Sequence, residues 1–266
     1  MKAWLAAILT SMALAALPAL AQDATPAWSE SFATLDNQLW QIQLFSFPAN
    51  GCNMTADQVS VTDGALRLGV AANPARTPDR PKMCKGGEIG SLKFFTYGLF
   101  MARMRSADLP GGVSAFFLMN AWQPENWEHR EIDIEFLGKQ PGAVQLTTHD
   151  FQNGGRDWKS APVTLDLGFQ ADRDFHDYAI LWTPNAVTWY VDGRALHRET
   201  RYVPHEPLQI RMNVYLGDPA EPGVTQWLGP ITAARLPAAA LYRDIRYYPL
   251  DALPAAYQGA LGHGEN

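Results

Sequence analysis

The sequence is poor in the residues that build metal centres and basic binding surfaces. It has two cysteines and six histidines, with no Cys-x-x-Cys pair and no His/Cys cluster, so no zinc site is indicated. Charged residues make up 18% of the chain, and 27 acidic side chains outnumber 21 basic ones. This balance argues against nucleic acid or an anionic membrane as a partner, and it suits a neutral, polyhydroxylated ligand.

Long helical patterns are lacking as well. No long stretch combines apolar residues at helical spacing with capping residues. Short alternating runs dominate instead, and Asp-Gly pairs at 63–64 and 192–193 lie between such runs, which is a strong hairpin signal. The strands that we expect cover residues 59–62, 65–68, 98–105, 113–119, 131–136, 144–149, 176–183, 187–191, 194–196, 208–216 and 241–248. Strands at this density, without interleaved helices, predict an all-β sandwich.

The first 21 residues have the pattern of a secretory signal peptide. Met1-Lys2 precedes an apolar run from Ala3 to Leu17, and Ala19-Leu20-Ala21 ends the segment. A membrane anchor is the weaker alternative, because the run is short and is interrupted at Thr10-Ser11. Cleavage after Ala21 would leave 20 basic side chains against 27 acidic ones, a net charge of about −7. We expect a secreted or periplasmic protein.

The remainder is expected to be one catalytic domain, residues 22–251, followed by a loose tail over 252–266 that is rich in Ala and Gly. Residues 73–85 are rich in proline and basic residues and are expected to form a surface loop. In an exported chain, the pair Cys52 and Cys84 is typical of a disulfide. Two unrelated thiols remain the alternative.

The main functional signal is the run Glu131-Ile132-Asp133-Ile134-Glu135. In a strand, the three acids would share one face while the isoleucines enter the core. Glycoside hydrolysis needs such a row, with one ionised and one protonated carboxyl group; the alternative is a solvated strand face. The α-carbons of Glu131 and Glu135 would lie roughly 13 Å apart, which allows a carboxyl separation of roughly 5–6 Å and favours a retaining mechanism.

The acidic run extended to Gly138 resembles the signature of glycoside hydrolase family 16, and within it that of the bacterial lichenases, which are endo-β-1,3-1,4-glucanases. The resemblance spans roughly residues 28–249. Its other motifs are Gly98-Leu99-Phe100, Gly111–Phe117, Phe175–Tyr178, Leu181–Pro184, Trp189–Gly193, Met212–Tyr215 and Trp227–Gly229. It implies a jelly-roll sandwich of two curved antiparallel sheets with a glycan cleft on the concave face, and it places Cys52 and Cys84 at the lichenase disulfide.

The resemblance also implies roles for individual residues. Glu131 would be the nucleophile, Glu135 the acid/base and Asp133 the assisting carboxylate. The chain lacks the residue that laminarinases, agarases and carrageenases insert before the second glutamate. The residues expected to bind substrate are Glu88, Phe117, Trp122, Trp127, Thr147, His149, Asn213 and Tyr215.

Several of these positions depart from the lichenase pattern. Gly90 stands where a subsite arginine is expected and Met119 where a stacking tyrosine is expected, while Thr147, His149 and Tyr215 replace Asn, Tyr and Trp. The substrate is therefore expected to be mixed-linkage β-glucan or a related bacterial β-glycan, including exopolysaccharides of the succinoglycan type. A transglycosylase and a lectin-like glycan-binding module are the alternatives, and a monomer is expected.

Catalysis is expected to need no cofactor. Lichenases bind a structural calcium ion on the convex face, and the matching positions here are Asp244, Gly64 and Ser29. Their oxygen atoms are ligands that calcium favours. The resemblance thus makes these three residues a candidate structural calcium site.

Overall fold

The computed structural model describes residues 24–76, 81–121, 128–152 and 157–259. The predicted signal peptide and two expected substrate-binding residues, Trp122 and Trp127, lie outside these ranges. The strands are β1 Trp28–Glu30, β2 Trp40–Ile42, β3 Cys52–Met54, β4 Val59–Thr62, β5 Ala65–Ala72, β6 Cys84–Phe95, β7 Gly98–Arg105, β8 Gly112–Met119, β9 His129–Leu137, β10 Ala143–Gln152, β11 Asp157–Ser160, β12 Val163–Asp166, β13 His176–Thr183, β14 Ala186–Val191, β15 Arg194–Glu199, β16 Leu208–Leu216 and β17 Ala238–Tyr248.

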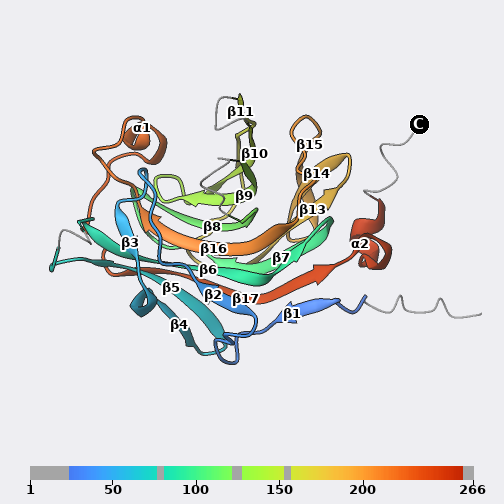
Figure 1. Ribbon diagram of the computed structural model, residues 1–266, viewed down its shortest axis with the longest axis horizontal. Helices are drawn as coiled ribbons and strands as arrows, with labels where there is room; N and C mark the ends of the chain where they lie inside the picture. The colour runs from blue at the N-terminus through green and yellow to red at the C-terminus, as the bar shows by residue number, and fades with distance from the viewer. Residues whose placement is uncertain (1–23, 77–80, 122–127, 153–156, 260–266) are drawn as a thin grey trace, which may run out of the picture.

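Helices are few and short: η1 Ala56–Gln58, α1 Val224–Leu228, η2 Leu250–Ala252 and α2 Ala255–Gln258. Within the described ranges, no helix is long and apolar enough to cross a membrane. The strands form two curved layers, which confirms the predicted all-β sandwich (Figure 1).

One layer, the inner sheet, has the order β2, β6, β16, β8, β9 and β10, with β11 and β12 both on the far edge of β10. The other layer, the outer sheet, has the order β4, β5, β17, β7, β13, β14 and β15. β1 and β5 pair with the same edge of β17, β5 with its first half and β1 with its second half. In Figure 1 the strands β9, β8, β16 and β6 lie above β17, and both layers curve upward.

Both predicted hairpins form at their Asp-Gly pairs. Thr62 pairs with Ala65 across Asp63-Gly64, and both turn residues have positive φ, 52° and 65°. The turn at Asp192-Gly193 repeats this pattern, with φ of 48° and 76°. Two successive positive φ values are the type I′ turn that aspartate and glycine favour between twisted strands.

The core lies between the sheets. Along β9, the residues Ile132, Ile134 and Phe136 are at most 2% exposed and point toward the outer sheet. The ring of Phe136 lies 4.8 Å from that of Tyr178 on β13. The Tyr242 hydroxyl, from β17, donates hydrogen bonds to backbone carbonyls of the inner sheet. The alternate residues of β9 therefore project from the opposite face, which we call the concave face.

β6 joins the two layers at its start. Cys84 and Lys85 pair with β5 of the outer sheet, whereas later residues pair with β2 and β16. Cys52 on β3 pairs with Cys84 and forms the predicted disulfide with it. The loop predicted over 73–85 is two residues too long, because β6 already begins at Cys84.

The C-terminal segment differs from its prediction. Residues 252–259 were expected to be part of a loose tail, but they include α2 and the buried side chains of Leu253 and Tyr257. These side chains pack beside Leu99 and Tyr190 of the outer sheet. Burial of the two hydrophobic side chains explains why this part of the tail is ordered.

Candidate functional site

The three acids of β9 lie on the concave face, as the alternation predicted. The intervening apolar residues are buried in the core, so the pleat of the strand turns Glu131, Asp133 and Glu135 outward together. Asp133, in the middle, is 3% exposed, while Glu131 and Glu135 are partly exposed. A solvated strand face does not fit this burial, because its middle carboxyl is almost completely removed from water.

Strand register places defined neighbours beside each acid. Residues that are paired across strands point to the same face. Glu131 is flanked by Met119 and His149, Asp133 by Phe117 and Thr147, and Glu135 by Ala115 and Gln145. The substrate-binding predictions Phe117, Thr147 and His149 therefore lie directly beside the acids.

Two histidines set the charge of Glu131. His129 Nε2 lies 2.6 Å from Glu131 Oε2, and the His149 ring adjoins that of His129, with 6.3 Å between centroids. Burial acts to raise the pKa of Glu131, but the charge and hydrogen bond of His129 outweigh it, with help from His149 and a hydrogen bond with Asp133. The net shift in pKa is downward, so Glu131 is ionised at neutral pH.

The other two acids are shifted the opposite way. Burial, and then the negative charge of Glu131, raises the pKa of Glu135 to about 8. Burial, and then the charges of Glu131 and Glu135, raises the pKa of Asp133 well above its ordinary value. At neutral pH the row therefore combines the Glu131 carboxylate with a protonated Glu135, which is the division that acid-assisted nucleophilic displacement needs, while Asp133 between them keeps its proton to higher pH than an ordinary aspartate.

A hydrogen-bond chain holds Glu135 from the side of α1. Trp227 Nε1 donates to Gln145 Oε1 at 3.2 Å, and Gln145 Nε2 donates to Glu135 Oε2 at 3.3 Å. With Oε2 engaged as an acceptor, the proton of Glu135 belongs on Oε1, where it can be given to a substrate. The sequence analysis missed His129, which lies two residues before Glu131 on β9, and Gln145, which lies opposite Glu135 on β10.

Further predicted residues lie along the same face. Asn213 pairs with Ala115 and with Glu88, and Asn213 Nδ2 lies 3.4 Å from Glu88 Oε2. Burial raises the pKa of Glu88 to about 7, although Arg211 and Asn213 act to lower it. Tyr215 is 4% exposed, and its ring contacts Phe47 edge-on. The fold thus brings the described predicted residues onto one face, centred on the acid row.

Arg211 is a charged residue of this face that the sequence analysis did not single out. It pairs with Phe117 on one side and with Gly90 on the other. Its guanidinium donates to Glu88 Oε1 and to Gln209 Oε1, both at 3.0 Å. A Cβ atom on Gly90 would lie 3.5 Å from Arg211 Cγ. The Arg211 side chain, from β16, therefore lies alongside the position at which the resemblance expected an arginine on β6.

Ligand-type atoms of Glu131, Asp133 and His149 lie within 4.8 Å of one another, a spacing compatible with a metal ion. The same spacing also serves proton sharing among carboxyl and imidazole groups. The hydrogen bonds that Glu131 makes with His129 and Asp133 fit proton sharing.

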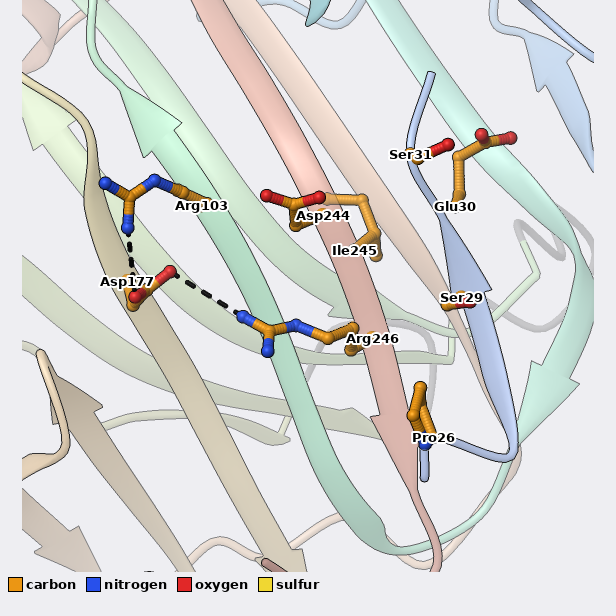
Figure 2. A pocket seen from close by; sticks show the side chains of 9 residues that line it. All are labelled: Pro26, Ser29, Glu30, Ser31, Arg103, Asp177, Asp244, Ile245 and Arg246. Carbon is orange, nitrogen blue, oxygen red and sulfur yellow. Dashed lines mark hydrogen bonds and ion pairs between the residues drawn. The ribbon is translucent and has the colours of Figure 1, made fainter. Parts of the chain in front are cut away.

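Two of the three predicted calcium residues line one pocket. Asp244 and Ser29 line one pocket of about 570 Å³ on the outer sheet, whereas Gly64 does not line it (Figure 2). Asp244 sits at a bulge of β17 with φ of 49°, and its carboxylate has no hydrogen-bond or ion-pair partner among the described residues. Asp177 binds the two arginines of the pocket, Arg103 at 3.1 Å and Arg246 at 3.8 Å. The pocket lining carries three carboxylates against these two arginines, and a carboxylate without a protein partner fits an oxygen-ligated cation.

Known proteins resemble this chain over most of its length. The family model for glycosyl hydrolases family 16 matches residues 47–229. A beta-glucanase of Brevibacillus brevis is 34% identical over 228 residues, covering 84% of this chain and 82% of that protein. A lichenase structure from a mouse hindgut metagenome has a TM-score of 0.72 at 31% identity, and the match covers 84% of this chain and 98% of that one. The structure of Bacillus licheniformis beta-glucanase has a TM-score of 0.70 at 32% identity, and the match covers 83% of this chain and 96% of that one.

Proposed function

Because this chain belongs to glycosyl hydrolase family 16, we propose that it is an exported, monomeric, retaining endo-β-glucanase that cleaves mixed-linkage β-1,3-1,4-glucan or a related bacterial β-glycan. The observation that carries the proposal is the row of Glu131, Asp133 and Glu135, in which the pKa of Glu131 is lowered and those of its two neighbours are raised. The names of the relatives, beta-glucanase and lichenase, support the substrate class.

In the first step, the Glu131 carboxylate attacks the anomeric carbon of the glycan. Glu135 gives its proton to the glycosidic oxygen as the bond from that oxygen to the anomeric carbon breaks. The product with the new hydroxyl group leaves, and the rest of the glycan is held as an ester on Glu131. His129, hydrogen-bonded to Glu131 Oε2, keeps this oxygen engaged and leaves Oε1 free for the attack.

In the second step, the now ionised Glu135 removes a proton from a water molecule. The water oxygen attacks the anomeric carbon, and Glu131 departs as a carboxylate, so the original configuration is restored. Asp133 shares a hydrogen bond with Glu131 that lowers the pKa of Glu131, and this bond stabilises the carboxylate each time it is released.

Two further proposals concern the surroundings of this reaction. We propose that a structural calcium ion binds at Asp244, on the face opposite the acids, where it would stabilise the fold without entering the chemistry. We also propose that residues 1–21 direct export, because the disulfide Cys52–Cys84 needs an oxidising compartment to persist.

Digestion of lichenan, laminarin, xyloglucan, agarose and a succinoglycan-type exopolysaccharide, side by side, tests the proposal. We expect new reducing ends from lichenan or the exopolysaccharide, with products sized by mass. Glu131→Gln should abolish them while circular dichroism stays unchanged, and the exposed control Asp166→Asn should retain full turnover. Glycan binding without cleavage would support the lectin-like alternative, and products longer than the substrate would support a transglycosylase.

A further inference from the structure

Four large hydrophobic side chains are exposed among the described residues, and all come from two neighbouring segments. Leu44 and Phe45 follow β2 directly and are 67% and 40% exposed. Leu92 and Phe94 belong to β6 and are 46% and 41% exposed. β2 and β6 pair with each other at the edge of the inner sheet. Folding gains nothing from leaving such surface in water, so those of these side chains that lie on the face of the acid row are candidates for a binding role.

Phe94 lies on the concave face in the same cross-strand row as the nucleophile. It pairs with Gln209, which pairs with Met119, which in turn pairs with Glu131. Paired residues share a face, so the four side chains project from the same side of the sheet. Three strand spacings separate Phe94 from Glu131, roughly 14 Å between α-carbons. An exposed aromatic ring therefore lies on the face that carries the chemistry, but well away from the bond that is cleaved.

Phe45 contacts the next row along, which contains Arg211, Phe117 and Asp133. The Arg211 guanidinium lies over the Phe45 ring, 5.8 Å from its centroid, at a distance typical of cation–π contact. Arg211 is itself 4% exposed and is fixed by Glu88 and Gln209. The arginine side chain runs alongside Gly90, with its Cγ 3.5 Å from where a Cβ atom of that residue would lie. A buried ion pair thus supports a partly exposed ring, which restricts its motion.

We propose that Phe45 and Phe94 form an additional sugar-binding subsite at the β6 side of the concave face, remote from the scissile bond. The occupant is a β-linked pyranose residue of the glycan chain, whose apolar C–H face stacks on the rings. The proposal rests on the proposed function, because a linear glycan bound across the acid row continues over β16 and β6. Arg211 acts as a positioning residue for Phe45.

Oligosaccharides of increasing length, cut from the best polysaccharide substrate, separate this subsite from the catalytic centre. We expect Phe94→Ala to lower kcat/KM about 10-fold, the factor that corresponds to 1.4 kcal/mol, for oligosaccharides long enough to reach β6. The shortest cleaved oligosaccharides should react at the wild-type rate. Phe45→Ala should show the same length dependence. Phe94→Trp keeps an aromatic ring and should cleave the long oligosaccharides with the wild-type kcat/KM. Leu92→Ala is the matched control, because Leu92 lines a separate edge pocket with Leu35 and Trp40.

An equal loss at every length, or no loss at any length, would overturn the subsite while leaving the hydrolase proposal intact. If the wild-type protein cleaves none of the polysaccharides, the proposed function fails. Affinity electrophoresis in gels that contain these polysaccharides then tests whether the subsite binds glycan. Slower migration of the wild type than of F94A in one of those gels would support it. Identical migration of the two proteins in all gels would refute it.

Discussion

Replacement of Glu135 by glutamine should abolish catalysis and make the folded protein more stable at neutral pH. The native pKa of Glu135 is about 8, against 4.5 ordinarily, because the group is buried beside the charge of Glu131. Between these two pH values, the folded chain binds a proton that the unfolded chain has released. The free energy of unfolding therefore falls as pH rises through this window. Glutamine carries no charge, so the variant escapes this loss.

The size of the effect follows from the shift. Each pH unit inside the window removes about 1.4 kcal/mol, so a lone group of this kind would lower stability by about 3 kcal/mol between pH 4.5 and pH 7. The charges of Glu131 and Asp133 titrate together with Glu135, which makes this value an upper bound. The hydrogen bond from Gln145 to Oε2 can be kept by a glutamine carbonyl, so little packing is lost.

Urea unfolding at pH 5 and pH 7, followed by tryptophan fluorescence, measures the effect. We expect E135Q to match the wild type within about 1 kcal/mol at pH 5 and to exceed it by up to about 3 kcal/mol at pH 7. Asp166→Asn, an exposed carboxyl on β12, should change neither value. A gain of equal size at both pH values, or no gain at pH 7, would refute the argument that burial and Glu131 hold the proton on Glu135.

Three further predictions test other parts of the structure. His129→Phe removes the charge and hydrogen bond that lower the pKa of Glu131, so the acidic limb of the kcat/KM profile should move to higher pH; an unmoved limb would exclude this role. Replacing Cys52 and Cys84 by serine opens a bridge of sequence separation 32 and should lower unfolding free energy by roughly 3–4 kcal/mol in urea titrations, whereas an unchanged midpoint would contradict it. Calcium should raise the wild-type Tm over that in EDTA but leave Asp244→Asn unaffected; equal calorimetric shifts in both proteins would place the ion elsewhere.

The sequence predicts the parts of the fold that depend on neighbours along the chain. Both Asp-Gly turns form, and β4, β7, β13 and β16 have the predicted bounds. The outward projection of Glu131, Asp133 and Glu135 follows from alternation alone. The short strands β1, β2, β3, β11 and β12 and the long β6 were missed, because strands of three or four residues carry little alternation and glycines break the apolar pattern of β6.

Side-chain contacts that depend on the register between distant strands could not be predicted from the sequence. Arg211 and Glu88 are 123 residues apart, and only the pairing of β16 with β6 brings them together. The departure at Gly90 is visible in the sequence, but the arginine that lies beside it comes from another strand. Phe94 is similar: only the pairing of β6 with β16, across a register shift, places it in one row with Gln209, and no local pattern records that shift.

The stereochemistry of the first product tests the central claim most directly. Proton NMR of a fresh digest, recorded before mutarotation, distinguishes the two anomers of the new reducing end. Attack by Glu131, followed by attack of water from the side that the leaving group vacated, predicts that the β anomer appears first and equilibrates later. An initial α anomer would contradict the double displacement and with it the role of Glu131 as nucleophile.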